Sequence, residues 1–253
     1  MKKALIITVA GTASRFNKDL DKETLKCLYF EGKPENSLLC QIIKNSGDFE
    51  QYVIVGGYLF DDLQSFTEDN LATLSGKITV VYNPYFKDYG SGYSLYLGIK
   101  AVKDDIDEVV FAEGDLFFDT QSMSSVVNSP TSVLTTNREA ILSNKAVALY
   151  IDVHDHPKYI YDTNHKFLQI DEPFKAIYNS GQIWKFSNAS LLKGIVQALN
   201  DKEQQGTNLV IVQKYFDAFE GNVDALPIDV WFNCNTVFDY RKVLKIIENE
   251  NNK

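Results

Sequence analysis

The sequence predicts an α/β protein with a mostly parallel central sheet, and two observations carry that prediction. Strand-like and helix-like stretches alternate along the first half of the chain. The strand-like stretches include continuous apolar runs, such as residues 3–9, which is the pattern of a strand covered on both faces. Such alternation is typical of βαβ units, whose strands lie parallel in one sheet.

The first half contains four expected strands with a helix expected in each gap between them. The strands are short apolar or β-branched runs at residues 3–9, 52–55, 78–82 and 108–112. Helices are expected where apolar residues recur three or four positions apart, at residues 35–44, 59–66 and 94–102. In the first helix the apolar stripe consists of Leu38, Leu39, Ile42 and Ile43, and in the last of Leu95, Leu97, Ile99 and Val102.

The second half differs, because its strand candidates follow one another without helices between them. They lie at residues 132–136, 146–153, 158–162, 167–170 and 177–186, with a hairpin turn expected at residues 162–165. Helices are expected at residues 189–199 and 208–220, then a last strand pair ending near Phe232, then a helix over residues 237–248. No linker separates the halves, so we expect a single domain over residues 1–253 whose antiparallel part shares the same sheet.

The composition excludes several classes of protein. The chain has 253 residues, 45% of them hydrophobic, a formal net charge of −9, and no basic stripe of the kind that nucleic-acid binders carry. No apolar run is long enough to span a bilayer, and residues 4–10 fit a core strand better than a signal peptide. We therefore expect a cytoplasmic protein with no membrane or nucleic-acid partner. Three scattered cysteines argue against a disulfide framework or zinc site, and His154 and His156 are expected in a polar loop.

Small and hydroxyl-bearing residues gather where the expected parallel strands end, which is the edge at which open α/β sheets bind ligands. Residues without bulky side chains let a backbone come close to a ligand, and hydroxyls offer hydrogen bonds. After the first three strands these residues are Ala10, Gly11, Thr12, Ala13, Ser14, Gly57, Ser91 and Ser94.

Two cationic side chains and two side chains with oxygen atoms that could bind a metal ion lie at the same edge. Arg15 and Lys26, together with backbone N–H groups, suit a polyphosphate. The side-chain oxygens of Asp115 and Asn235 are hard ligands that suit Mg²⁺. The combination indicates nucleotide chemistry. Each residue also has an ordinary interpretation, because a single lysine or arginine is often just solvated and Asn235 could equally cap the last helix.

Three motifs of other protein classes are absent from the chain. Without GxxxxGK[ST] the protein is not a Walker-type ATPase, and without GxGxxG after the first strand a dinucleotide fold is not supported. Without GxSxG an α/β-hydrolase is disfavoured as well.

Four segments carry a resemblance to a known family. They read AGTASRF at residues 10–16 followed by Lys26, NPYFKDY and YSLYL within residues 83–97, EGD at residues 113–115, and CNTVFDY at residues 234–240. They resemble four segments of the sugar-phosphate-type nucleotidyltransferases. The first is similar to that family's signature A-G-x-G-[ST]-R-[LF] followed by P-K, and the second to its segment after the third strand. The third is similar to its metal motif [DGE]-x-D, and the fourth to its closing motif [IV]-[DN]-T-x-x-D-[YL]. The second segment most resembles the bacterial phosphocholine cytidylyltransferases, and the opening resembles those acting on phosphoglutamine.

The resemblance implies a GT-A-like, Rossmann-related fold with three layers, α/β/α, a mostly parallel mixed sheet and an inserted antiparallel subdomain. It implies a nucleotide-binding half at residues 1–130, an acceptor-binding subdomain at residues 131–230 and a closing segment at residues 231–253. The small residues and serines at the strand ends would then bind the nucleotide.

The resemblance also implies a reaction, in which an acceptor phosphate attacks the α-phosphate of a nucleoside triphosphate and pyrophosphate leaves. Arg15 would bind the β- and γ-phosphates, and Lys26 would neutralise charge at the α-phosphate. Asp115 and Asn235 would hold Mg²⁺. Such a site works mainly by positioning and charge neutralisation.

The nucleotide and acceptor also follow from the resemblance. CTP is implied by the segment around residues 89–97, and the acceptor is a small phosphorylated amine or amino acid: phosphocholine, phosphoglutamine or a phosphonate, used in modifying a cell-surface polysaccharide. Acids suit an amino group and aromatic rings suit a quaternary ammonium, so the expected acceptor-binding residues are Asp171, Glu172, Tyr178 and Trp184. A homodimer is left open.

The chain departs from the family pattern at three positions. Ala13 stands where the family has a second glycine, Leu25 where it has proline, and Asn235 where many members have aspartate. None of these removes the cations or Asp115, so we expect an active enzyme. The alternatives are a nucleotidyltransferase for sugar 1-phosphates, a glycosyltransferase that uses the acid-x-acid motif for a nucleotide-sugar, and a non-catalytic nucleotide-binding regulatory module.

Overall fold

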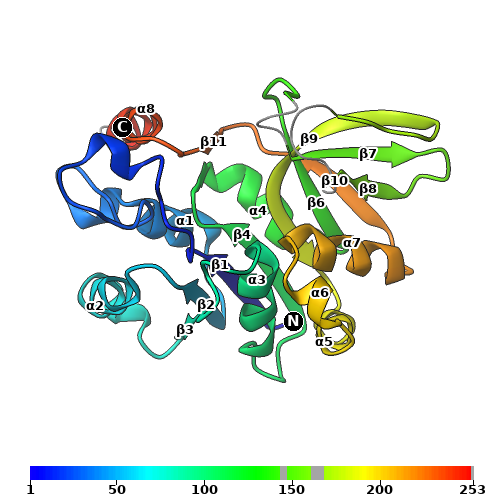
Figure 1. The fold of residues 1–253 in the computed structure, drawn as a ribbon, viewed down its shortest axis with the longest axis horizontal. Coiled ribbons are helices and arrows are strands. Elements are labelled where there is room, and N and C mark those ends of the chain that lie inside the picture. The colour runs from blue at the N-terminus through cyan, green and yellow to red at the C-terminus, as the bar shows by residue number, and fades with distance from the viewer. Residues whose placement is uncertain (143–146, 161–167, 252–253) are drawn as a thin grey trace.

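One continuous sheet organises the chain. The computed structural model describes residues 1–142, 147–160 and 168–251. In that part of the chain the sheet has nine strands, seven of them in the order β10-β6-β9-β4-β1-β2-β3 (Figure 1). Four strands of the first half run parallel: β1 (Lys3–Thr8), β2 (Gln51–Gly56), β3 (Ile78–Tyr82) and β4 (Glu108–Glu113).

The other strands make the sheet mixed. The long β9 (Phe174–Phe186) pairs antiparallel with β4 through its last residues, and with β6 (Ser132–Asn137) on its other side. Its first half extends from the main sheet and pairs with β7 (Ala148–Asp152), which pairs in turn with β8 (Pro157–Tyr159). At the outer edge β10 (Val223–Pro227) runs parallel to β6. The antiparallel part therefore shares its sheet with the parallel part, as the missing linker predicts.

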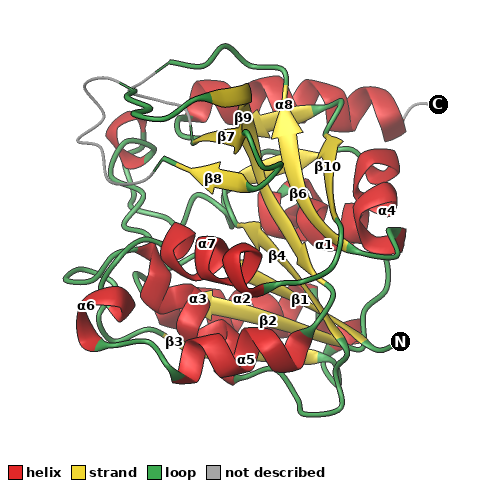
Figure 2. Cartoon of the chain, turned by 90° about the vertical axis from the view of Figure 1, so that its right-hand side faces the viewer, coloured by secondary structure: helices red, strands yellow, loops and turns green. Residues whose placement is uncertain are grey.

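Helices cover both faces of the sheet (Figures 1 and 2). Alternate residues of β1 show the two faces, because Ala4 and Ile6 belong to one buried cluster while Leu5 and Ile7 belong to another. The first face packs on α3 (Ser91–Lys100), α5 (Ala189–Gln197) and α7 (Asn208–Ala218), and the second on α1 (Leu38–Ser46), α2 (Phe60–Asn70) and α4 (Thr120–Asn128). This confirms the three-layer fold class.

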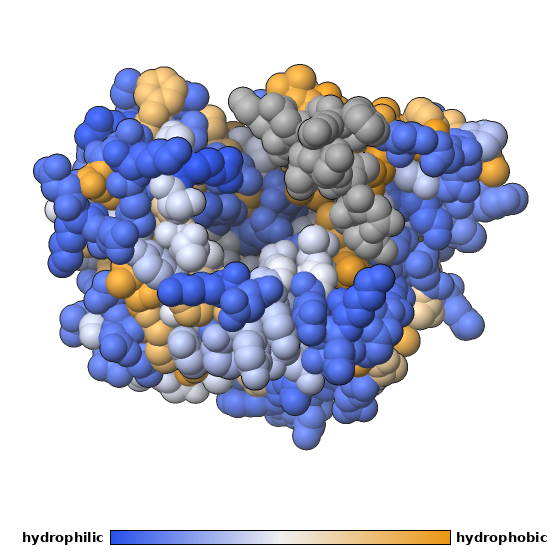
Figure 3. All heavy atoms as spheres, in the orientation of Figure 1, coloured by the Kyte–Doolittle hydropathy of each residue, from blue (hydrophilic) through white to orange (hydrophobic). Residues whose placement is uncertain are grey.

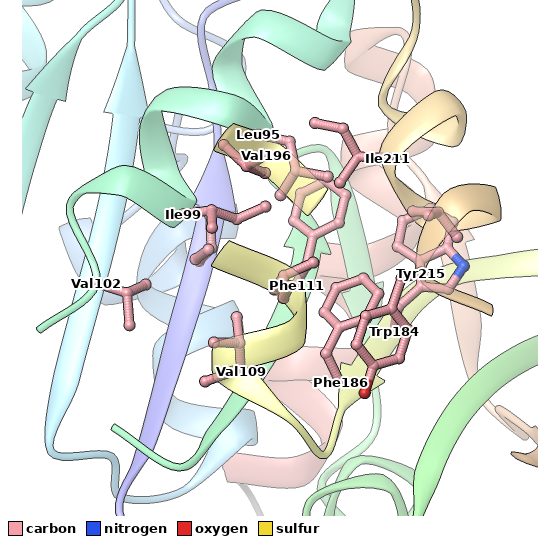
Figure 4. Close-up of a cluster of buried hydrophobic side chains, with 14 of the residues drawn as sticks. Leu95, Ile99, Val102, Val109, Phe111, Trp184, Phe186, Val196, Ile211 and Tyr215 are labelled. Atoms are coloured by element: carbon pink, nitrogen blue, oxygen red, sulfur yellow. The ribbon is translucent and has the colours of Figure 1, made fainter. Parts of the chain in front are cut away.

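The first cluster is the main aromatic core, part of which Figure 4 shows. Trp184 of β9 stacks on Phe111 of β4 with ring centroids 5.1 Å apart, and both are fully buried. A third buried cluster packs under the C-terminal helix α8 (Val237–Asn251) and includes Tyr240, Phe16 and Phe117. Four short helical segments complete the structure: η1 (Asn17–Asp19), η2 (Pro34–Asn36), η3 (Ala72–Leu74) and α6 (Asp201–Gln204).

Several expected elements are wrong or displaced. The last two strands do not pair with each other, because β10 joins the main sheet and β11 (Trp231–Asn233) pairs with an unexpected β5 (Leu116–Phe118). Helix α6 has no counterpart among the expected elements, and residues 168–170 form no strand. The helix expected from residue 35 begins at Leu38, because Ser37 caps it by accepting the N–H of Cys40 at 3.3 Å. The expected turn at residues 162–165 lies outside the described residues.

No helix in the described parts of the chain combines the length and apolar character that crossing a membrane requires.

Candidate functional site

A cavity of about 290 Å³ lies at the C-terminal ends of β1 and β4, beside the start of α3. It is the place where ligands of parallel α/β sheets bind, and the face drawn in Figure 3 is hollowed near its centre. The cavity is lined by Thr8, Val9, Ala10, Gly11, Leu25, Lys26, Cys27, Asn83, Phe86, Tyr89, Gly90, Ser91, Ser94, Glu113, Gly114 and Asp115. A second hollow of about 200 Å³ shares Lys26 with it and is lined by Thr12, Ala13, Ser14, Arg15, Phe16 and Asn235.

The loop after β1 takes a tight path past the second hollow. Ala13 has a φ of +52°, in the left-handed region that favours glycine. Its carbonyl accepts the N–H of Asn17 at 2.9 Å, and the fully buried ring of Phe16 anchors the loop. The loop therefore keeps the left-handed backbone conformation at the position where the family pattern has glycine. In this chain Ala13 adopts that conformation, at a cost in backbone strain.

Ala13→Gly is expected to raise the free energy of unfolding by about 0.5 kcal/mol, because relief of left-handed strain exceeds the added entropy of the unfolded chain. Ala198 is a matched control, since it is exposed with a φ of −88°. There the same exchange is expected to lower stability by about 0.5–1 kcal/mol. Urea unfolding of both variants checks this, and equal losses would contradict the strain at Ala13.

Four of the predicted residues converge between the two hollows. The Lys26 ammonium lies 2.6 Å from Oδ2 of Asp115 and 3.5 Å from Oδ1 of Asn235. Arg15 donates to the same Oδ1 at 2.8 Å. These contacts join residues up to 220 positions apart in the sequence. The structure therefore brings two cations together with two oxygens that could bind a metal ion.

The strands at this edge explain how Asp115 and Asn235 become neighbours. β11 pairs with β5, and the N–H of Cys234 donates to the carbonyl of Asp115 at 2.8 Å. Gly114 lies so close to β1 that a Cβ there would be 2.3 Å from Cγ1 of Val9. The glycine of the EGD segment is thus needed for close packing of the strand ends.

The side chain of Asn235 is not used to cap α8. Thr236 and Asp239 do this reciprocally, because Oδ2 of Asp239 accepts the N–H of Thr236 at 3.0 Å while Oγ1 of Thr236 accepts the N–H of Asp239 at 3.2 Å. The capping interpretation of Asn235 is therefore wrong. Its side-chain amide donates instead to Oδ1 of Asn233 at 2.8 Å, which turns its oxygen toward the two cations.

The carboxylate of Glu113 lies on the cavity wall beside this cluster. It accepts from Nδ2 of Asn208 at 2.6 Å. Burial raises the pKa of Glu113 to about 7, and the neighbouring carboxylate of Asp115 acts in the same direction. Glu113 is thus an acidic group held in the cavity by a residue of the second half of the chain.

Both predicted serines line the cavity with one lone pair already used. Oγ of Ser94 accepts from Nδ2 of Asn83 at 2.9 Å, and Oγ of Ser91 accepts the N–H of Asn208 at 3.1 Å. Gly57 does not line the cavity; it packs against Phe86, whose Cβ would be 2.5 Å from a Cβ on Gly57. Gly57 therefore shapes the wall from behind.

The four expected acceptor-binding residues are not among the cavity walls. Asp171, Glu172 and Tyr178 are exposed on or just before β9, with Glu172 accepting from the hydroxyl of Tyr150 at 2.6 Å. Trp184 is fully buried in the core, where its Nε1 donates to the hydroxyl of Tyr159 at 2.6 Å. The prediction that Trp184 binds an acceptor is therefore wrong, because no ligand reaches it there.

Residues that the sequence did not single out also line the site. Glu113 belongs to the EGD segment but is not among the expected ligand-binding residues. Asn208 does not line the cavity itself; it donates to Glu113 on the cavity wall, and no local pattern singles it out. Tyr89 lies on the cavity wall and stacks on Tyr85 with centroids 4.6 Å apart. The four-residue spacing of these tyrosines, which places them on one side of a turn, was the available signal for Tyr89.

The residues present fit a magnesium ion that also binds phosphate. Oδ1 of Asp115 is buried without a hydrogen-bond partner, and Asn235 supplies a second hard oxygen. The described residues include no group of three or more His, Cys, Asp or Glu side chains that could hold a metal by themselves. Mg²⁺ commonly takes one or two protein ligands plus substrate phosphates.

His154 and His156 lie in a turn away from this site, where their backbone N–H groups donate to Oδ1 of Asp152.

Solved structures of nucleotidyltransferases have the same fold. An inositol-1-phosphate CTP transferase from T. maritima aligns with a TM-score of 0.69 and 16% identity, over 98% of this chain and 96% of that chain. The CTP:phosphocholine cytidylyltransferase of Streptococcus pneumoniae aligns with a TM-score of 0.62 and 17% identity, over 98% and 100%. A UDP-glucose pyrophosphorylase complexed with UDP-glucose aligns with a TM-score of 0.69 and 12% identity, over 99% and 100%.

These alignments confirm, at the level of fold, the resemblance to sugar-phosphate nucleotidyltransferases. No curated protein sequence matches the chain. Residues 22–247 match a sequence family described as "Domain of unknown function (DUF6564)". The chain therefore belongs to the DUF6564 family, and its fold is that of the sugar-phosphate nucleotidyltransferases.

Proposed function

We propose that this protein is a nucleotidyltransferase that transfers CMP from CTP to a small phosphorylated amine or amino acid, with release of pyrophosphate. The observation that carries the proposal is the cluster of Arg15, Lys26, Asp115 and Asn235 between the two hollows at the strand ends. A clamp of two cations beside a metal-binding carboxylate is what transfer from a triphosphate needs.

The proposed reaction is an in-line displacement at phosphorus. An oxygen of the acceptor phosphate forms a bond to the α-phosphorus of the nucleotide. The bond from that phosphorus to the bridging oxygen breaks, and pyrophosphate leaves with the electron pair. Arg15, which lines the second hollow, would bind the β- and γ-phosphates, and Lys26, which lines both hollows, would bind the α-phosphate.

Asp115 and Asn235 would hold Mg²⁺, which when bound neutralises phosphate charge and orients the triphosphate. The chain's own part is to hold Asp115 just before β5 and Asn235 just after β11. There Lys26 approaches both side chains, and Arg15 approaches Asn235. Leu25 and Cys27 flank Lys26 as buried residues, so the backbone there is held by packing although the family's proline is missing.

The preference for CTP rests on the resemblance of residues 83–97 to the phosphocholine enzymes and on two similar structures whose names include CTP. The amine-bearing acceptor rests on the resemblance to the phosphocholine and phosphoglutamine enzymes and on one similar structure whose name includes phosphocholine. A sugar 1-phosphate is the second candidate acceptor, because a UDP-glucose pyrophosphorylase and the inositol-1-phosphate enzyme align with the same TM-score of 0.69.

Pyrophosphate release with Mg²⁺ tests the proposal. Each of the four nucleoside triphosphates is combined with phosphocholine, phosphoethanolamine, aminoethylphosphonate, phosphoglutamine, glycerol phosphate or a sugar 1-phosphate. A CTP-dependent signal with one amine-bearing acceptor is expected. Turnover only with a sugar 1-phosphate would replace the acceptor class. Silence across the panel, with CTP still raising the melting temperature, would favour a binding module.

Lys26→Met is expected to tighten Mn²⁺ binding, measured without nucleotide, by about tenfold, because the ammonium no longer competes for the oxygens of Asp115 and Asn235. Electron paramagnetic resonance of free Mn²⁺ measures this directly. Lys22→Met, at an exposed lysine of the same loop, is the control and is expected to leave the affinity unchanged. Equal affinities for wild type and Lys26→Met would show that Lys26 and the metal do not share these oxygens.

A further inference from the structure

Asn208, the first residue of α7, connects two walls of the cavity from outside it. Its side chain is 4% exposed. Nδ2 donates to Oε1 of Glu113 at 2.6 Å, and the backbone N–H donates to Oγ of Ser91 at 3.1 Å. These partners lie 95 and 117 positions away in the sequence, at the end of β4 and at the start of α3.

The two bonds decide what each wall group can offer a ligand. Because Ser91 accepts the N–H of Asn208, its own O–H proton is available for donation. Because Asn208 engages Oε1 of Glu113, the other oxygen, Oε2, remains able to accept. Ser91 and Glu113 both line the cavity. One residue thus sets a hydroxyl donor and a carboxylate acceptor on the same cavity.

The segment that leads into Asn208 is docked tightly on the segment that carries Ser91. The N–H of Gly90 donates to the carbonyl of Gln205 at 2.9 Å, and the N–H of Gly92 donates to the carbonyl of Gly206 at 3.0 Å. A Cβ on Gly90 would lie 2.3 Å from the oxygen of Gly206, and one on Gly92 would lie 2.7 Å from it. Only glycine allows this approach, so the position of Asn208 relative to Ser91 is held by backbone contacts.

We propose that Asn208 is a positioning residue, which holds Glu113 and Ser91 in the orientation that binds the nucleoside part of the nucleotide. This inference rests on the proposed function. A hydroxyl or amino group of the sugar or base could donate to Glu113, and an oxygen of the sugar or base could accept from Ser91. Helix capping alone does not require the side-chain bond to Glu113, because the helix donor is already satisfied by Ser91.

Asn208→Leu tests the role against a matched control on the same helix. Gln213 is 7% exposed and also makes buried hydrogen bonds, accepting the N–H of Tyr159 at 2.7 Å and donating to the carbonyl of Pro157 at 3.0 Å. Both Asn208→Leu and Gln213→Leu are expected to lower the melting temperature. Only Asn208→Leu is expected to raise KM and Kd for the nucleotide, by about tenfold, with KM for the acceptor unchanged.

An exchange of donor and acceptor supplies the second test. Asn208→Asp alone sets two carboxylates against each other and is expected to weaken nucleotide binding more than Asn208→Leu does. Combining it with Glu113→Gln restores a hydrogen bond of the opposite direction, and part of the affinity for CTP, measured by calorimetry, is expected to return.

The outcomes separate this inference from the proposed function. Equal effects of Asn208→Leu and Gln213→Leu on nucleotide affinity, or no recovery in the double variant, overturn the positioning role. A wild type that binds no nucleoside triphosphate overturns the proposed function, and this inference with it. A wild type that binds CTP but turns over no acceptor leaves the role of Asn208 measurable by calorimetry alone.

Discussion

Asp115→Asn is expected to lower kcat for nucleotidyl transfer by about 10³-fold, whereas Asn235→Ala is expected to lower it by only about tenfold. Asp115 carries the one formal charge of the pair, and its Oδ1 is the buried oxygen without a partner. Asn235 offers a neutral amide oxygen that Arg15 and Lys26 already approach. Removing the carboxylate therefore removes most of the electrostatic attraction for a divalent cation.

Steady-state kinetics at saturating Mg²⁺ and nucleotide measure both variants. Asp229→Asn is the control, because Asp229 is an exposed acid paired with Arg138 on the surface; it is expected to leave kcat unchanged. Unfolding curves of all three variants separate catalysis from folding. Equal losses for Asp115→Asn and Asn235→Ala would show that the two oxygens contribute alike.

Lys185→Met is expected to lower the free energy of unfolding by about 3–5 kcal/mol, which is the usual cost of breaking a buried ion pair. The side chains of Lys185 and Glu108 are each 1% exposed, with Nζ 3.0 Å from Oε2. Nζ also donates to the carbonyl of Ser129 at 2.5 Å, just after the end of α4. Within the described residues, the substitution leaves the buried carboxylate of Glu108 one cationic neighbour, the partly exposed Lys3, whose Nζ lies 3.6 Å from Oε2.

The matched control is Lys193→Met, which removes a surface pair. Asp104, the partner of Lys193, is fully exposed, so the loss is expected to stay below about 1 kcal/mol. Adding Glu108→Leu to Lys185→Met removes the orphaned charge, and much of the stability is expected to return. Urea unfolding measures the series. Similar losses for Lys185→Met and Lys193→Met would contradict a buried pair.

Local sequence predicted the parallel strands well, because each is a short apolar or β-branched run that can be recognised from its own residues. β3 has the predicted bounds, and β1 and β4 differ by one residue. Helix α3 begins three residues before its predicted start, because glycines such as Gly92 lower the helix propensity of its first turn. Position 92 requires glycine because of its close approach to Gly206, which is a tertiary requirement.

The candidate site was predicted in its residue types but not in its pairings. Arg15, Lys26, Asp115 and Asn235 were all expected at the strand ends, and they do converge. That Arg15 approaches Asn235 while Lys26 approaches Asp115 depends on the pairing of β11 with β5. No local pattern encodes that pairing, because two three-residue strands carry too little periodicity to be recognised.

The sequence by itself determined the α/β class, the four strands of the first half and the edge at which the chemistry is expected, because these follow from hydrophobic periodicity and from the residues that end each strand. Only the tertiary structure decided that Trp184 belongs to the core and that Asn208 donates to Glu113 on the cavity wall. An aromatic side chain serves a core or a binding site equally well, and an amide has no preferred partner until packing sets one beside it. Contacts across about a hundred residues are decided by how layers pack, which neighbouring residues in the sequence do not encode.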